Sequence, residues 1–351
     1  MTRVRRSEEQ LDLFGPARPE SAGPEAPGPR ARRGSLAVGA VDVPEELQAV
    51  ARRLPARVYL GTSSWSFPGW AGLVYDREVS KEKLAREGLS AYACHPLLRA
   101  VGIDRTYYAP LPASEFARYA AAVPDGFRFL VKAHELCTVA RFPEQARYGG
   151  QRGKRNDLFL NSSYAIAEVV TPVVEGLGAK AGPLLFQFPP QDVSGLGGPE
   201  GFADRLHAFF RMLPRGPLYA VEIRNARLLH PLYVQALQDV GVCHCLSAHP
   251  SMPDIGSQAR LIGELGAATV VRWMLARHLS YEEARERYRP FNRIVDQDVA
   301  AREAIATRCA AAARLRRPAF VIINNKAEGS APLSAFRLAE RIVAQLQGGP
   351  T

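Results

Sequence analysis

Short runs of apolar, mostly β-branched or aromatic residues alternate with longer amphipathic stretches along the chain beyond residue 57. Near-continuous apolar runs of this length are typical of parallel strands buried on both faces, and the stretches between them are typical of covering helices. Eight runs occur in order: VYLGTS (58–63), AVGID (100–104), FRFLVKA (127–133), LLFQF (184–188), YAVEIR (219–224), VCHCLS (242–247), TVVRW (269–273) and FVIINN (320–325).

The stretches between the runs predict helices, for example at 114–123, 201–213, 232–240 and 333–346. A strand–helix unit repeated eight times in this length predicts an α/β fold of the (βα)8 class, a TIM barrel, over residues 58–349. An open doubly wound sheet is the alternative, but no glycine-rich dinucleotide turn follows the first strand. Residues 43–57 are expected to form a lead-in helix.

Residues 1–42 have a different composition from the rest of the chain. Pro, Gly, Ala, Arg and Glu dominate GPARPESAGPEAPGPRARRG (15–34), and such a segment cannot bury enough apolar area to offset its ordering entropy. We therefore predict a disordered N-terminal tail. One apolar cluster interrupts this tail, the pentapeptide QLDLF at 10–14.

This pentapeptide resembles the motif by which bacterial polymerases and repair proteins bind the DNA sliding clamp, usually Gln-Leu-Ser/Asp-Leu-Phe. The resemblance implies that Gln10 would supply a polar anchor, while Leu11, Leu13 and Phe14 would supply the apolar contacts. A flexible tether suits this role because it orders only on binding. An incidental apolar patch, or an arm that packs back on the barrel, is the alternative.

The chain carries a formal net charge of +10 over 351 residues. Residues 1–57 hold ten arginines and eight acidic residues, so most of the excess lies in the predicted barrel. A basic surface attracts nucleic acid or phosphorylated ligands, although arginine-rich usage can also serve solubility alone. No apolar run reaches the roughly 20 residues that span a bilayer, and no signal sequence is evident, so we expect a cytoplasmic protein without a membrane partner.

Polar and aromatic residues collect where the predicted strands end. In a barrel of this class the carboxyl ends of the strands form the catalytic face. The candidate site residues are Trp65 and Trp70 after the first run, Asp104, Arg105 and Tyr107 at the second, Lys132 at the third, Gln187 at the fourth, Glu222 and Arg224 at the fifth, Arg272 at the seventh, and Asn324 and Asn325 at the eighth.

The segments GTSSWSFPGW, LLFQFPP, AVEIR and INNKAEGSAP together resemble the YecE-like proteins, domain-of-unknown-function family seventy-two. The resemblance begins near Val58 and implies a TIM barrel, but it supplies no reaction. This chain departs from the family pattern at 102–108, where a glutamate usual in relatives is missing, and at Lys326, which replaces a frequent histidine. These exchanges make the expected pocket more basic.

The candidate residues favour an anionic ligand. We expect Lys132, Arg224 and Arg272, with Arg105, to converge on one mouth, where cations favour phosphate. Gln187, Asn324 and Asn325 would orient the ligand, and Trp65, Trp70 and Tyr107 would offer flat faces to a base or sugar. An internal ion-pair network closing the barrel top is the alternative reading.

The reaction is less defined than the site. If the protein is an enzyme, phosphoester hydrolysis is the class to test first, with Glu222 as base and Lys132, Arg224 and Arg272 stabilising charge. The alternatives are a non-catalytic binding or recruitment module, and a glycosidase that uses Asp104 and Glu222. No cofactor is predicted.

A divalent metal is compatible with the His, Asp and Glu residues present, although none has the tight spacing of a metal motif and no ligand is assigned. An insert at 141–159, RFPEQARYGGQRGKRNDLF, adds a basic flap or a solvated loop on the same face.

Overall fold

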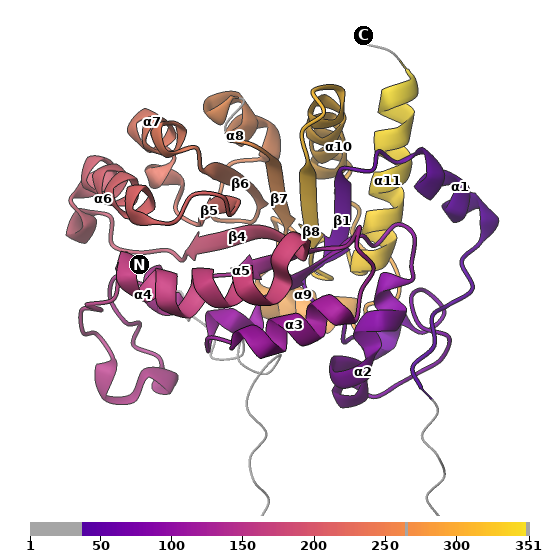
Figure 1. The fold of residues 1–351 in the computed structure, drawn as a ribbon. Helices are drawn as coiled ribbons and strands as arrows, with labels where there is room; N and C mark the ends of the chain where they lie inside the picture. The colour runs from indigo at the N-terminus through magenta and orange to yellow at the C-terminus, as the bar shows by residue number, and fades with distance from the viewer. Residues whose placement is uncertain (1–36, 264–265, 349–351) are drawn as a thin grey trace, which may run out of the picture.

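The computed structural model describes residues 37–263 and 266–348. Eight parallel strands form a closed barrel in sequence order, which confirms the predicted α/β TIM-barrel fold (Figure 1). The strands are β1 (Val58–Thr62), β2 (Ala100–Ile103), β3 (Arg128–Lys132), β4 (Ala181–Phe188), β5 (Tyr219–Ile223), β6 (Cys243–Ala248), β7 (Thr269–Trp273) and β8 (Ala319–Ile323).

Closure of the barrel joins the first strand to the last. β1 pairs with β8 over its whole length, from Val58 opposite Ala319 to Thr62 opposite Ile323. On its other side β1 meets β2 at Gly61, where a Cβ atom would lie 1.9 Å from the carbonyl oxygen of Ala100. Only glycine allows the two strands to approach this closely.

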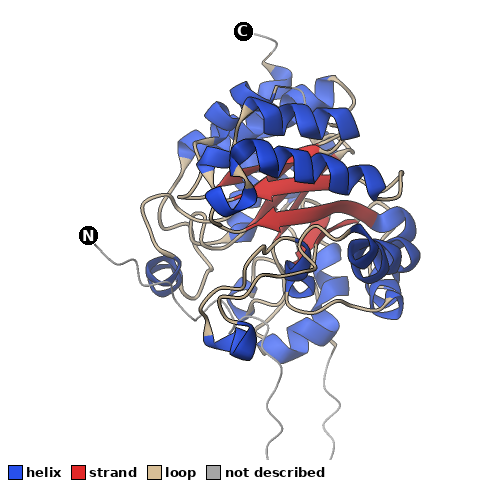
Figure 2. Cartoon of the chain, turned by 90° about the vertical axis from the view of Figure 1, so that its left-hand side faces the viewer, coloured by secondary structure: helices blue, strands red, loops and turns tan. Residues whose placement is uncertain are grey.

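Helices surround the strands, as Figure 2 shows in blue around red. Those helices that the sequence predicted at 114–123, 201–213, 232–240 and 333–346 correspond to α3, α6, α7 and α11. Among the described residues, none of the helices is both long enough and apolar enough to cross a membrane. The α-helices are α1 (Glu45–Arg53), α2 (Lys81–Ala93), α3 (Ala113–Ala121), α4 (Ser162–Ala165), α5 (Thr171–Leu177), α6 (Gly198–Met212), α7 (Pro231–Val240), α8 (Ile255–Ile262), α9 (Tyr281–Tyr288), α10 (Val299–Arg314) and α11 (Ala331–Gln347).

Side-chain caps fix where several of these helices begin. Ser80, Asp254, Ser280 and Asp298 each accept a hydrogen bond from the backbone N–H three residues on, at the starts of α2, α8, α9 and α10. Such caps satisfy a backbone donor that the helix itself leaves free, and each contributes about 1 kcal/mol.

Two apolar layers form the core. One lies between the strands and the helices. The other fills the barrel interior and consists of Ala100, Leu130, Leu185, Ala220, Cys243, Cys245, Ala268, Val270, Phe320 and Ile322. The interior layer takes alternate residues of each strand because successive side chains of a strand point to opposite faces.

Residues 37–42 pair with a neighbouring loop. Residues 37–42, which we assigned to the tail, include Ala40, which forms an antiparallel bridge with Tyr75. Val41 N–H also donates to the Val74 carbonyl and Asp76 N–H to the Gly39 carbonyl, so these residues of the predicted tail lie against the loop that precedes α2. The QLDLF pentapeptide at 10–14 lies outside the described residues.

Candidate functional site

A polar layer closes the carboxyl end of the barrel interior. Side chains two positions apart on a strand point to the same face. On five strands, the residue two positions after the last apolar residue of the interior layer therefore also points into the barrel. These residues are Lys132, Gln187, Glu222, Ser247 and Arg272, and all are buried. Asp104 joins them from just beyond β2.

An ion-pair network crosses this layer. Arg272 Nη1 donates to Glu222 Oε2 at 2.7 Å, and Arg272 Nη2 donates to Asp104 Oδ2 at 2.9 Å. Arg224 Nε donates to Glu222 Oε1 at 2.9 Å, and Ser247 Oγ donates to the same oxygen at 3.1 Å. These contacts bring the two arginines and the two carboxylates into one cluster.

Glu222 is held as a carboxylate within this network. Burial alone would raise the pKa of Glu222, but the guanidinium groups of Arg272 and Arg224 outweigh burial and hold that pKa well below its usual range. Both oxygens already accept hydrogen bonds from positively charged donors. These contacts favour a role in positioning the two arginines over the general-base role that we predicted.

Lys132 lies in the same layer but has no carboxylate within ion-pair distance among the described residues. Its Nζ atom lies 3.6 Å from the centre of the Tyr107 ring, a cation–π contact. Burial lowers the pKa of Lys132 to about 7; nearby Asp104 opposes this change, while Arg272 and Arg224 add to it. Lys132 therefore loses its proton far more readily than an exposed lysine.

Two further groups in the layer remain available to a ligand. Within the described part of the chain, the Nη atoms of Arg224 have no hydrogen-bond partner, since only Nε is engaged. The side-chain amide of Gln187 likewise has none among the residues described. Gln187 stands beside Glu222 in the β4–β5 pairing, so both groups border the same part of the mouth.

The predicted aromatic platforms divide into two kinds. Tyr107 is buried, and Lys132 Nζ lies over its ring face. Trp65 and Trp70 instead pack inward, with their indole N–H groups donating to the Leu84 carbonyl at 3.1 Å and to Asn325 Oδ1 at 3.3 Å. Both tryptophans are buried, so they support the wall of the barrel and present no free face.

The asparagines after β8 also form internal contacts. Asn324 Nδ2 donates to Ser63 Oγ at 2.9 Å, and its Oδ1 accepts from the backbone N–H of Lys326 at 3.0 Å. Asn325 Oδ1 accepts from the N–H of Ala331 at 2.8 Å. These bonds shape the β8–α11 turn, and they place the two side chains away from the ligand-orienting role that we predicted.

Arg105 does not join the other cations. Its guanidinium lies 4.0 Å from Glu115 of α3 and is about two-fifths exposed. The chain turns into a one-turn helix at Arg105–Tyr107, which directs Arg105 outward and Tyr107 inward. The prediction that Arg105 lines the mouth with Lys132 is therefore not supported by its contacts.

Two residues of the basic insert, Arg147 and Tyr148, contact residues near the mouth. Arg147 Nη2 donates to Glu135 Oε2 at 2.6 Å, Tyr148 OH donates to the same oxygen at 2.8 Å, and the Arg147 guanidinium lies over the Tyr108 ring. Glu135 was not among the residues predicted for the site, although it lies three residues beyond Lys132. In Figure 1 the insert extends from the lower left of the barrel.

A second buried lysine lies under the segment that follows β7. Lys326 Nζ lies 4.0 Å from the Tyr281 ring centre and 5.7 Å from that of Phe291. Burial lowers the pKa of Lys326 to about 8, and Arg285 and Arg289 add to this effect. Tyr281 and Phe291 thus cover Lys326. Lys132 differs, because the Arg224 guanidinium, whose Nη atoms have no hydrogen-bond partner among the described residues, acts on its charge.

Side chains that bind metals do not gather in the described structure. No group of three or more His, Cys, Asp or Glu among those residues is placed to hold a metal ion. His134 Nδ1 instead pairs with the Tyr164 hydroxyl at 2.6 Å, and His249 Nδ1 with the Ser251 hydroxyl at 2.8 Å.

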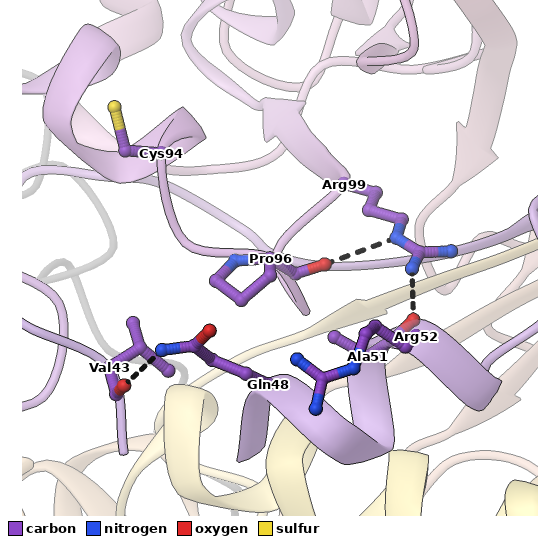
Figure 3. A pocket seen from close by; sticks show the side chains of 7 residues that line it. All are labelled: Val43, Gln48, Ala51, Arg52, Cys94, Pro96 and Arg99. Carbon is purple, nitrogen blue, oxygen red and sulfur yellow. Dashed lines mark hydrogen bonds between the residues drawn. The ribbon is translucent and has the colours of Figure 1, made fainter. Parts of the chain in front are cut away.

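A cavity of about 520 Å³ lies at the opposite, amino end of the barrel, beside α1 (Figure 3). Arg99, the residue before β2, borders it and donates to the carbonyl oxygens of Ala51 and Pro96. The guanidinium thus caps the end of α1, so its donors are used within the protein. This cavity is separate from the polar layer, because it adjoins the amino ends of the strands.

Together the fold and the polar layer define a closed (βα)8 barrel with an arginine-, lysine- and carboxylate-lined carboxyl mouth. The family model described as "Protein of unknown function DUF72" matches residues 59–350, and the chain belongs to this family. The resemblance seen in the sequence motifs is therefore confirmed.

Solved structures of other family members share the fold. The chain resembles a DUF72 family protein from Thermotoga maritima MSB8 with 17% identity and a TM-score of 0.51, covering 81% of this chain and 98% of that one. It also resembles a DUF72 family protein from Enterococcus faecalis V583, with 16% identity, a TM-score of 0.50, and coverage of 81% and 95%. The comparison with curated proteins gave no match.

Proposed function

We propose that the mouth of the barrel binds an anionic, phosphate-bearing ligand. The observation that carries this proposal is the excess of cationic donors over carboxylates in the mouth. Lys132 has no carboxylate within ion-pair distance among the described residues, and the outer nitrogens of Arg224 have no partner there. A bound phosphate would supply the missing acceptors.

The nearby carboxylates are already matched with arginines. Arg272 pairs with Asp104 and Glu222, and Arg147 pairs with Glu135. None of them is left to neutralise Lys132. Arginine suits the ligand-facing position because its planar guanidinium can donate two parallel hydrogen bonds to phosphate oxygens.

Phosphoester hydrolysis is the reaction class that we favour if the site is catalytic. Arg224, Arg272 and Lys132 would stabilise charge on the phosphoryl group. The glycosidase alternative is weaker, because Arg272 binds both Asp104 and Glu222 and the pKa of Glu222 is held low, whereas such an enzyme needs one protonated carboxyl group. A non-catalytic binding module would use the same donors without a reaction.

Nucleic acid is the ligand source that the whole sequence favours. The net charge of +10 would attract a polyanion, and the tail pentapeptide at 10–14 resembles a sliding-clamp motif. We propose that this motif tethers a cytoplasmic protein to the DNA sliding clamp. The five free cysteines agree with a reducing compartment.

Direct binding measurements test the proposal. The purified chain would be titrated with a labelled single-stranded oligonucleotide, a labelled duplex and inorganic pyrophosphate over a series of salt concentrations. We expect Arg224→Gln to weaken binding about tenfold or more, since a charge-assisted hydrogen bond contributes about 1.5–3 kcal/mol.

Arg105→Gln is the matched control, because Arg105 faces α3 and should leave binding unchanged. Equal binding by the wild type and Arg224→Gln would overturn the proposal. A steep loss of affinity with salt for the oligonucleotides, with weak pyrophosphate binding, would identify nucleic acid as the ligand.

A further inference from the structure

Lysine is rare in this chain, and one of its lysines lies in the candidate site. Six of the 45 basic residues are lysines: Lys81, Lys83, Lys132, Lys154, Lys180 and Lys326. Lys132 shares the polar layer with Glu222 and Arg272, and Arg224 pairs with Glu222 there. Arginine would hold a phosphate equally well there, but only lysine can lose its proton near neutral pH and react as an amine.

The surroundings of Lys132 favour the neutral amine. The side chain is 7% exposed, which removes most of the water that would solvate an ammonium ion. Two guanidinium groups, those of Arg272 and Arg224, lie close enough to disfavour a third positive charge, and Asp104 offsets only part of this effect. Burial next to other cations is a known way to activate a lysine as a nucleophile.

The groups that face Lys132 leave its nitrogen without a hydrogen-bond or ion-pair partner among the described residues. The Tyr107 ring covers one side at 3.6 Å. No described residue donates a hydrogen bond to Nζ or forms an ion pair with it, so the nitrogen lone pair is not engaged when the amine is neutral. The free Nη atoms of Arg224 belong to the same cluster of interacting charges.

We propose that Lys132 forms a covalent imine with an aldehyde or ketone that carries a phosphate group. This inference rests on the proposed phosphate-binding function and names the substrate class for the same site. Arg224 would hold the phosphate, and Lys132 would attack the carbonyl carbon.

The step balances without any further reactant. The lone pair of neutral Nζ forms the new N–C bond as the carbonyl π electrons move to oxygen, giving a carbinolamine after proton transfer from nitrogen to oxygen. The C–O bond then breaks, the oxygen leaves as water with the second nitrogen proton, and the imine remains. Protonation of the imine gives an iminium cation that the Tyr107 ring can stabilise from below.

Reductive trapping tests this inference on the full chain. The protein would be incubated with sodium cyanoborohydride and either glyceraldehyde 3-phosphate or glyceraldehyde, a pair that differs only in phosphate. Intact mass and peptide mapping would then locate the adduct among the six lysines. We expect Lys132 to be labelled at least tenfold faster by the phosphorylated probe.

A second arm identifies the source of the carbonyl group. A single-stranded oligonucleotide with an aldehydic abasic site presents the same aldehyde and phosphate chemistry as the small probe. Faster trapping of the oligonucleotide would assign the site to DNA, and faster trapping of glyceraldehyde 3-phosphate would assign it to small sugar phosphates. Either result supports the imine.

Variants separate the chemistry from folding. Lys132→Met should abolish the specific adduct, and Lys326→Met should retain it, because Lys326 is the other buried lysine and lies under Tyr281 and Phe291. If Lys132→Met fails to fold, Lys132→Gln replaces it, since glutamine is neutral and polar and forms no imine.

The outcomes for the two proposals differ. Labelling spread evenly over the lysines, or unchanged in the folded Lys132 variant, would overturn the imine. Arg224→Gln should slow trapping of the phosphorylated probe about tenfold more than trapping of glyceraldehyde, which slows only as far as loss of the Arg224 charge raises the pKa of Lys132. Specific labelling of Lys132 with no advantage for the phosphorylated probe would keep the imine and reject the phosphate site.

Discussion

Arg272 and Glu222 form an ion pair with 2.7 Å between Nη1 and Oε2, and both side chains are essentially inaccessible to solvent inside the barrel. The two residues come from β7 and β5, which are separated by β6 in the sheet. Because the second guanidinium nitrogen binds Asp104 beyond β2, one arginine joins three parts of the barrel mouth.

Removal of Arg272 should therefore destabilise the protein. We expect Arg272→Met to lower the free energy of unfolding by about 3–5 kcal/mol, because it leaves Glu222 buried with one arginine partner fewer and Asp104 without its ion pair. Urea unfolding followed by circular dichroism would measure the change.

Arg105→Met is the matched control for this prediction. Its partner Glu115 lies 4.0 Å away at a partly exposed site, and pairs of this kind contribute about 0–1 kcal/mol. If both variants lost the same free energy of unfolding, the buried ion pairs of Arg272 would stabilise the protein no more than an exposed pair does.

Lys132 should make stability depend on pH. Its pKa in the folded protein is about 7, below the ordinary value of 10.5, so between these values the unfolded chain binds a proton that the folded chain does not. Raising the pH through this window therefore favours folding, whereas below about pH 7 the full cost of burying the charge is present.

The variant Lys132→Met removes this dependence. We expect its stability relative to the wild type to be highest near pH 6 and to fall steadily as the pH rises from 7 towards 10. Urea unfolding of both proteins at several pH values measures this difference. A difference that stayed constant across the range would mean that Lys132 remains charged in the folded state.

Strand periodicity made most of this site predictable from the sequence. Because side chains alternate along a strand, Lys132 had to face the same way as Leu130, and Glu222 the same way as Ala220. All eight strands were predicted within a few residues of their observed bounds. The convergence of residues from separate strands then followed from barrel closure.

Positions beyond the strand ends were less predictable. There the direction of a side chain depends on turn geometry, which sends Arg105 outward and Tyr107 inward within a single helical turn. The sequence could not show whether the Trp65 and Trp70 rings pack inside the protein or face a ligand, because an indole ring is suited to both. The pairing of Glu135 with Arg147 joins two loops, and no periodic pattern links them.

The basic insert should depend on Glu135 for its position. Glu135 accepts hydrogen bonds from both Arg147 and Tyr148 of the insert, so Glu135→Gln removes the charge that attracts Arg147. We expect faster amide hydrogen exchange over residues 146–151 and faster tryptic cleavage after Arg147, with little change in the melting temperature.

Glu144→Gln provides the comparison, because Glu144 is an exposed carboxylate in the same insert. It should leave exchange over 146–151 at the wild-type rate. If both variants behave like the wild type, packing of the insert, and not the Glu135 contact, holds the segment in place.

The QLDLF motif at 10–14 lies outside the described structure, but its proposed role can be tested directly. If QLDLF binds the sliding clamp, Leu13→Ala combined with Phe14→Ala should reduce clamp affinity by about 2–4 kcal/mol, the range of apolar hot-spot residues. Fluorescence anisotropy of the labelled full chain with purified bacterial clamp would measure this. The melting temperature should stay unchanged, since a tether contributes nothing to the barrel core.

Glu8→Ala with Glu9→Ala, just before the motif, should retain binding. Undiminished binding by the Leu13 and Phe14 variant would reject the tether, and a lower melting temperature would indicate that the segment packs on the barrel.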